Sequence, residues 1–176
     1  NFDPKVIPHP VRDHKEGLFG VSDKFNIGEG FILTTIFDLD SYIDRKNPFG
    51  AINAFIEASK NMSFRDEAKL IIKVNGSMGR EKVLNKINMI KERNDLRIIV
   101  IDDFLSEDEM IGLRNITDLF LSLHRSEGFG LNLIENMNAG NLVIGTNYSG
   151  NTDFMNDNNS LLVDFEMVPV GKDQYP

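Results

Sequence analysis

The sequence predicts an α/β protein with a Rossmann-like fold, a three-layer sandwich in which about six parallel strands lie between helices on both faces. Two features predict this. Apolar segments of strand length alternate along the chain with segments that have the periodicity of an amphipathic helix. The strand segments are also apolar at successive positions, as in a parallel sheet that helices cover on both faces.

Each element follows from its residues. Strands rich in Ile, Leu, Val and Phe are expected at 30–37, 68–74, 96–102, 118–123, 141–146 and 160–165. Helices are expected at 47–61, 80–93, 106–115 and 130–140, with a short helix or turn at 150–157. Pro48 suits a first helical turn, Ser106 with Glu109 forms a capping-box pattern, and Gly140 is typical of a helix end.

The composition restricts the partners of the protein. A net charge of −8 argues against nucleic acid or an anionic membrane as the main partner. The absence of cysteine excludes disulfides, thiolate metal sites and cysteine nucleophiles. No apolar run approaches the roughly 20 residues of a transmembrane helix. We therefore expect a cytoplasmic protein without a transmembrane segment, or one at the inner face of a membrane in a full-length protein.

The two ends of the chain indicate a fragment. Residues 1–17 include Pro4, Pro8 and Pro10, as an interdomain linker would, and the first residue is Asn1 rather than methionine. The last residues, 166–176, complete no further element. We expect 1–17 to be a linker from a missing N-terminal domain, and 18–176 to be a Rossmann-like domain that is truncated at its C-terminus.

The segment HRSEGFGLNLIENMNAGN, residues 124–141, predicts an anion site. Gly128 and Gly130 allow the backbone to approach a ligand closely. The amides from Gly130 to Leu133 begin a helix, so they have no partners within it, and the helix dipole adds to them. Together they predict a phosphate or diphosphate site at a strand-to-helix loop.

Glu127 and Glu135 lie eight positions apart, on either side of this predicted site. An ionised carboxylate accepts hydrogen bonds and donates none, so it suits hydroxyl groups. In a nucleotide sugar, a sugar and a ribose flank the diphosphate. The pattern therefore predicts that amides bind the anion while carboxylates bind the hydroxyls.

The segment EGFGLNLIE resembles the E-x7-E motif of retaining glycosyltransferases with the two-domain GT-B fold. The resemblance covers residues 6–164, nearly the whole chain. FDLDSYIDRKNPFGAINAF, at 37–55, resembles the first strand and basic loop of the family's C-terminal domain, and 100–163 resembles its donor-binding half. The order of these pieces makes the match more specific than the motif alone.

The resemblance implies a role for each matching residue. Glu127 would bind the transferred sugar, while Lys46 with Arg45 would neutralise the leaving diphosphate. The family's first strand is often followed by a Gly-Arg pair; here Phe37 and Asp38 stand there, so Arg45 would replace that arginine. The donor-binding residues would be Gly128, Phe129, Gly130, Leu131, Asn132, Glu135 at the ribose, and Asp103 and Phe104 at the base.

The resemblance also implies the ligands. The donor would be a UDP-, GDP- or ADP-sugar, and no metal or other cofactor is expected. The acceptor, whether a saccharide, a lipid-linked glycan or a protein, would bind through the missing N-terminal domain. The full-length protein would be a hexosyltransferase, and this fragment alone would be inactive.

Two other interpretations remain open. Asp38 and Asp40 form a D-x-D pattern that could hold a divalent cation against a diphosphate. Asp102 and Asp103 follow a strand, as the acidic pair of a receiver domain does, which would make the chain a non-catalytic phosphate- or nucleotide-binding module. His124, at the end of a strand, is expected to be structural rather than catalytic.

Overall fold

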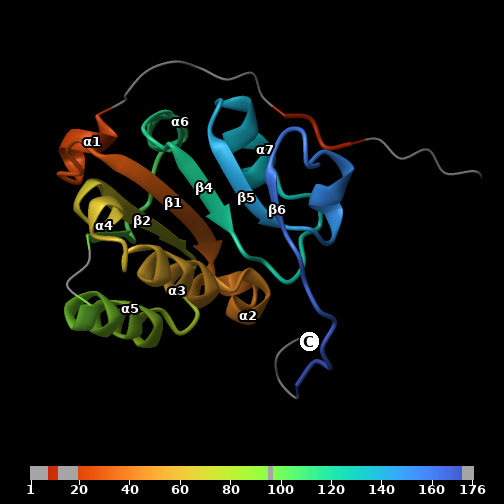
Figure 1. Cartoon of the computed structure of the whole chain (residues 1–176), viewed down its shortest axis with the longest axis horizontal. Coiled ribbons are helices and arrows are strands. Elements are labelled where there is room, and N and C mark those ends of the chain that lie inside the picture. The colour runs from red at the N-terminus through yellow and green to blue at the C-terminus, as the bar shows by residue number, and fades with distance from the viewer. Residues whose placement is uncertain (1–7, 12–19, 95–96, 172–176) are drawn as a thin grey trace, which may run out of the picture.

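The computed structural model describes residues 8–11, 20–94 and 97–171. Their core is one sheet of parallel strands in the order β3-β2-β1-β4-β5-β6 (Figure 1). The strands are β1 Phe31–Asp38, β2 Ala68–Asn75, β3 Ile98–Ile101, β4 Leu119–Ser122, β5 Leu142–Thr146 and β6 Leu161–Val163. All six expected strands and their parallel arrangement are confirmed.

Helices connect and cover these strands. They are α1 Val21–Lys24, α2 Ile43–Lys46, α3 Pro48–Ala58, α4 Met62–Glu67, α5 Arg80–Asn94, α6 Glu107–Asn115 and α7 Leu131–Asn138, with 3₁₀ turns η1 Leu39–Ser41 and η2 Gly150–Asp153. The capping box of Ser106 and Glu109 is present at the start of α6. The expected helices 80–93, 106–115 and 130–140 are confirmed as α5, α6 and α7.

The helix predicted at 47–61 was wrong in its extent. The segment expected as one helix from 47 to 61 ends at Ala58, and a separate helix, α4, follows. Asn61 causes the break, because its side chain accepts hydrogen bonds from the amides of Ser63 and Phe64 and so begins a new helix. The basic residues expected in a loop lie on the short helix α2.

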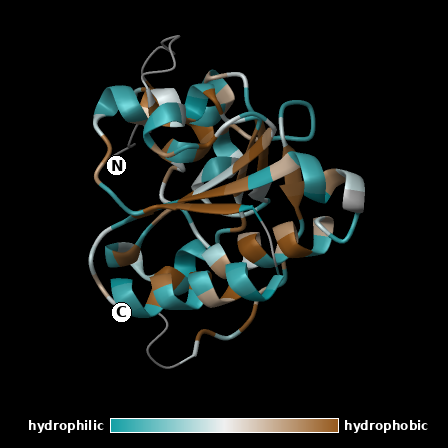
Figure 2. Ribbon diagram, turned by 90° about the vertical axis from the view of Figure 1, so that its left-hand side faces the viewer, coloured by the Kyte–Doolittle hydropathy of each residue, from teal (hydrophilic) through white to brown (hydrophobic). Residues whose placement is uncertain are grey.

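The sheet has a hydrophobic core on each face. β1 contributes Ile32 and Ile36 to one core and Leu33 and Phe37 to the other, because successive side chains of a strand point to opposite faces. The first core is covered by α1, α6 and α7, and the second by α3, α4 and α5. Figure 2 shows the resulting three layers, with the hydrophobic strands between two helical layers. The predicted three-layer sandwich is therefore confirmed.

The order of the strands creates a crevice between β1 and β4. From β1 the chain continues to β2 on one side, whereas from β4 it continues to β5 on the other. Asp118 fixes this central pair, because its carboxylate accepts a hydrogen bond from the Ile32 amide at 2.7 Å. Parallel α/β sheets bind ligands at such a switch point, beyond the carboxyl ends of the strands.

The predicted domain bounds stay predictions. Most of the expected linker 1–17, the start of the strand expected at 96–102, and residues 172–176 lie outside the described residues. Within the described ranges, no helix has the length and apolar character that crossing a bilayer requires.

Candidate functional site

A cavity of about 340 Å³ lies at the switch point. Its walls are the carboxyl ends of β1 and β4, Asn75 at the end of β2, and the first turn of α7. Lys46, Glu127 and Phe129 also line it. One cavity thus contains six residues of the predicted site: Lys46, Glu127 and the four residues from Phe129 to Asn132.

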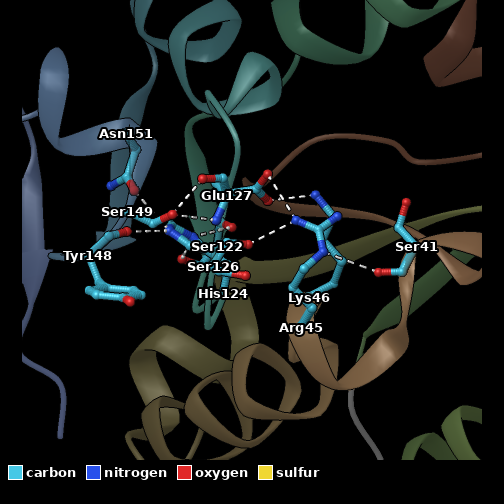
Figure 3. A network of polar contacts seen from close by, with 10 residues as sticks. All are labelled: Ser41, Arg45, Lys46, Ser122, His124, Ser126, Glu127, Tyr148, Ser149 and Asn151. Carbon is cyan, nitrogen blue, oxygen red and sulfur yellow. Dashed lines mark hydrogen bonds and ion pairs between the residues drawn. The ribbon is translucent and has the colours of Figure 1, made fainter. Parts of the chain in front are cut away.

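The centre of this site is an ion cluster around the Glu127 carboxylate (Figure 3). Lys46 Nζ lies 2.5 Å from Glu127 Oε1, and Arg45 Nη1 lies 3.5 Å from Oε2. The exposed fractions of the Lys46 and Glu127 side chains are only 16% and 12%, so solvent screens this pair less than it would a surface pair. Arg45 also donates to the carbonyl of Ser126 at 2.9 Å.

Backbone contacts hold α2 against the end of β4. Asn47 ends α2 in the left-handed conformation, with φ of 46°, and its side chain donates to the carbonyl of Leu123 at 2.8 Å. The Arg125 amide donates to the carbonyl of Arg45 at 2.8 Å. These contacts bring two basic residues to a glutamate that is about 80 positions away in sequence.

The loop after β5 holds the backbone of Glu127. Ser149 Oγ accepts from the Glu127 amide at 2.9 Å and donates to its carbonyl at 2.5 Å, and the Gly150 amide donates to the same carbonyl at 3.1 Å. Ser149 has φ of 83°, which is rare for a residue with a side chain. Ser149 was not predicted as a site residue, and its only local signal in the sequence is the turn-forming pair Ser149-Gly150.

His124 is a structural residue, as expected. Its side chain is buried, and Nε2 lies 3.0 Å from Asn151 Oδ1 and 3.3 Å from the carbonyl of Tyr148. Nδ1 lies 3.1 Å from Ser122 Oγ. His124 therefore joins the end of β4 to the loop after β5, beneath the Glu127 backbone (Figure 3).

The first turn of α7 supplies backbone donors to the cavity. Gly130, with φ of 95°, precedes the helix, and no side chain caps it. Among the described residues, the amides of Leu131 and Asn132 have no hydrogen-bond partner. Because the positive end of the helix dipole coincides with these donors, this turn is suited to an anion.

Phe129 precedes Gly130 and closes one side of the cavity. Its ring packs against Phe154, with 5.3 Å between ring centroids, and against His9 at 5.9 Å. The side chain is half-buried, so it contributes to packing and to the cavity wall together.

Five predicted site residues, of which Arg45, described above, is one, do not line this cavity. Gly128 is exposed beside it, Asp103 and Phe104 are exposed in the loop after β3, and the exposed fraction of Phe104 is 90%. Glu135 lies one turn further along α7 and forms an ion pair of 3.1 Å with Arg114 of α6. Arg114 was not predicted as a site residue, since nothing in the local pattern indicates which residue of another helix faces Glu135.

The D-x-D carboxylates of Asp38 and Asp40 accept hydrogen bonds from backbone amides. Asp38 accepts a hydrogen bond from the Asp40 amide, and Asp40 accepts from the amides of Ser77 and Met78 at 3.0 and 2.9 Å. These amides hold the pKa of Asp40 below its usual value. Over the ranges 8–11, 20–94 and 97–171, no three His, Cys, Asp or Glu residues are grouped as metal ligands.

The acidic pair of the receiver interpretation lies elsewhere. Asp102 and Asp103 follow β3, which is an edge strand, rather than a central strand next to the cavity. Asp102 forms an ion pair with Arg80, and 3.3 Å separates Arg80 Nη2 from the Asp102 carboxylate.

Comparison with known proteins shows the family of the chain. The family model described as glycosyl transferases group 1 matches residues 34–168. The chain is 30% identical over 133 residues to the serotype-specific mannosyltransferase WbdA of Escherichia coli. That match covers 75% of this chain but only 15% of WbdA, so the chain spans a small part of this relative's length.

Solved structures share the fold at low sequence identity. HepE of Anabaena, in complex with UDP and glucose, is 16% identical with a TM-score of 0.67, over 84% of this chain and 38% of HepE. The C-terminal domain of LpcC, a group 1 glycosyl transferase of Francisella tularensis, is 18% identical with a TM-score of 0.62, over 86% of this chain and 76% of that domain. The chain therefore belongs to the group 1 glycosyltransferases and has the fold of their C-terminal domain.

Proposed function

We propose that this domain binds the nucleoside diphosphate sugar donor of a retaining glycosyltransferase in the cavity between β1 and β4. The observation that carries the proposal is the meeting of unpaired helix amides, a lysine and a glutamate in one cavity. Group 1 membership supports a glycosyl donor. The UDP and glucose bound by HepE and the mannosyltransferase activity in the name of WbdA support a nucleotide sugar.

The diphosphate would lie at the first turn of α7. There the amides of Leu131 and Asn132 would donate to its oxygens, and Lys46 would supply a positive charge. Arg45 would act from behind Lys46, because it lies near Glu127 but does not line the cavity. Glu127 would accept hydrogen bonds from hydroxyls of the transferred sugar.

The nucleoside would extend away from Glu127. We propose that Glu135 binds the ribose hydroxyls, with Arg114 holding one carboxylate oxygen and leaving the other for the ligand. Asp103 and Phe104 would border the base. The 90% exposed fraction of Phe104 supports a contact with a ligand or a neighbouring domain, since a large apolar ring gains from being covered.

In the reaction, the bond between the anomeric carbon and the diphosphate oxygen breaks, and negative charge develops on the leaving diphosphate. Amides already aimed at this position, together with Lys46, stabilise that charge without reorganising. The acceptor hydroxyl attacks on the same face of the sugar, and its proton passes to the departing diphosphate. The acceptor would bind through another domain of the full-length protein.

Calorimetric titration tests this proposal. The domain should bind UDP, GDP and ADP with a preference for one of them and for its sugar conjugate, and the affinity should fall as salt concentration rises, because the diphosphate contact is ionic. The matching nucleoside without phosphates should bind much more weakly. If none of the three nucleoside diphosphates binds at millimolar concentration, the proposed function is wrong.

A further inference from the structure

Lys73, a buried lysine that the proposed mechanism does not use, lies beside the cavity. It is on β2, two residues before the cavity residue Asn75, and its exposed fraction is 1%. Its ammonium donates to the carbonyl of Val74 at 2.9 Å and to Asn75 Oδ1 at 2.6 Å. A buried cation is costly unless it is paired, so these contacts need a reason beyond packing.

Burial and neighbouring carboxylates act in opposite directions on the pKa of Lys73. Burial lowers the pKa of Lys73, and the nearby charge of Arg80 lowers it further. The carboxylates of Asp102, Asp103 and Asp38 act in the opposite direction and favour the protonated form. An ammonium group has three donors and no acceptor.

The ammonium fixes the orientation of the Asn75 amide. As an ammonium, Lys73 can only donate, and the Asn75 atom that faces it is the carbonyl oxygen Oδ1. The two N–H donors on Nδ2 then point away from Lys73. Within the described part of the chain, Asn75 Nδ2 has no hydrogen-bond partner, and Asn75 lines the cavity.

We propose that Asn75 donates a hydrogen bond from Nδ2 to an oxygen of the donor's nucleoside, and that Lys73 is the positioning residue that holds the amide in this orientation. This inference rests on the proposed function of the cavity. Asn75 ends β2, beside Asp38 in the register of β1, whereas the anion site follows β4. Two strand spacings, about 10 Å, separate β2 from β4. The ligand group that reaches Asn75 is therefore the nucleoside and not the diphosphate.

A double-mutant cycle with Lys73→Met and Asn75→Ala tests the inference, with binding of UDP, GDP, ADP and inorganic pyrophosphate measured by calorimetry. Asn75→Ala should weaken the preferred nucleoside diphosphate about fivefold, as expected for one neutral hydrogen bond, and leave pyrophosphate unchanged. Lys73→Met should also weaken that nucleoside diphosphate, but it should have no further effect in the Asn75→Ala background.

The ligands distinguish two possible acceptor oxygens. Uracil and guanine carry carbonyl oxygens and adenine does not, whereas all three share the ribose. A loss confined to UDP and GDP assigns the contact to the base, and an equal loss for all three assigns it to the ribose. Either result supports the inference, provided that thermal unfolding shows that each variant is folded.

Other results overturn it. If Lys73→Met weakens pyrophosphate as much as the nucleoside diphosphate, or acts equally with and without Asn75, Lys73 acts only through its charge or through stability. If Asn75→Ala changes nothing while the parent domain binds its ligand, the contact does not exist but the proposed function stands. Failure of the parent domain to bind any nucleoside diphosphate rejects both.

Discussion

At the scale of single residues, the ion pair between Lys46 and Glu127 brings together the two charges that the proposed reaction needs. The pair is close, at 2.5 Å, and mostly shielded from solvent. A bound diphosphate would compete with Glu127 for Lys46, while sugar hydroxyls would compete with Lys46 for Glu127. Each side chain therefore holds its partner in place until the donor provides a replacement.

Lys46→Ala should weaken diphosphate binding more than nucleoside binding. A charge-assisted hydrogen bond is worth about 1.5–3 kcal/mol, which corresponds to a loss of about ten- to a hundredfold in affinity. Titration with pyrophosphate, UDP and uridine measures the difference. Lys24→Ala is a matched control, since Lys24 pairs with Glu109 on the surface and its loss removes the same charge.

Equal affinity of Lys46→Ala and the parent for UDP would make Lys46 an ordinary structural residue. A chelator should change the affinity of neither protein. A strong loss on chelation would instead support a metal ion at Asp38 and Asp40.

Glu127→Gln and Glu135→Gln should behave differently. Glu127→Gln removes the carboxylate that neutralises Lys46, so UDP binding should be spared or tightened, while binding of the sugar conjugate should weaken. Glu135→Gln should weaken both ligands alike if Glu135 binds the ribose. The expected loss is about 1–2 kcal/mol per contact, which is about five- to thirtyfold in affinity.

Calorimetric titration of both variants with UDP and UDP-glucose, or with the preferred nucleotide and its sugar, gives four comparisons. Identical effects of the two substitutions would mean that the carboxylates do not lie on either side of the diphosphate.

At the scale of elements, the loop after β4 and the loop after β5 pack directly on each other. A Cβ atom at Gly150 would lie 2.0 Å from the backbone oxygen of Gly128, so a side chain does not fit there. Ser149 adds two hydrogen bonds to the Glu127 backbone. The position of Glu127 is therefore set by two loops, each anchored to its own strand.

Gly150→Ala should separate these loops. We expect a loss of about 1–3 kcal/mol in the free energy of unfolding, because neither backbone can move without breaking the bonds to Glu127. Binding of the nucleotide sugar should fall as well. Urea unfolding and titration measure the two effects.

Gly140→Ala is the control for this substitution. Gly140 has a positive φ, of 84°, and a Cβ atom there would meet open space. It should cost only the backbone strain, about 1 kcal/mol, and leave binding unchanged. If Gly150→Ala binds the nucleotide sugar like the parent, the contact between the loops does not position Glu127.

At the scale of the whole molecule, the domain has one proposed donor site, and helices cover both faces of its sheet. The relatives are much longer: the chain spans 15% of WbdA and 38% of HepE. An acceptor must reach the sugar held at Glu127, and in the proposed function another domain brings it there.

Residues 1–176 alone should therefore bind the donor and transfer nothing. The expected result is measurable binding of the nucleoside diphosphate together with no transfer to any saccharide acceptor above the rate in its absence. A radiolabelled nucleotide sugar measures transfer and hydrolysis in one assay. Efficient transfer over many turnovers by these residues alone would contradict the prediction.

Much of the architecture could be predicted from the sequence because it depends on local patterns. The apolar runs that became β1 and β2 bury both faces of each strand, and that requirement is visible in consecutive residues. Gly130 and the apolar periodicity after it predicted α7, and the helix geometry by itself leaves the amides of Leu131 and Asn132 unpaired.

The site itself depends on contacts between distant residues, which only the tertiary structure decided. Lys46 meets Glu127 because the strand order places β1 next to β4, and no local pattern states that order. The pairing of Glu135 with Arg114 and the use of Asp40 by backbone amides follow from packing of separate elements for the same reason. Local sequence determined which groups are available, whereas long-range packing determined which of them face each other.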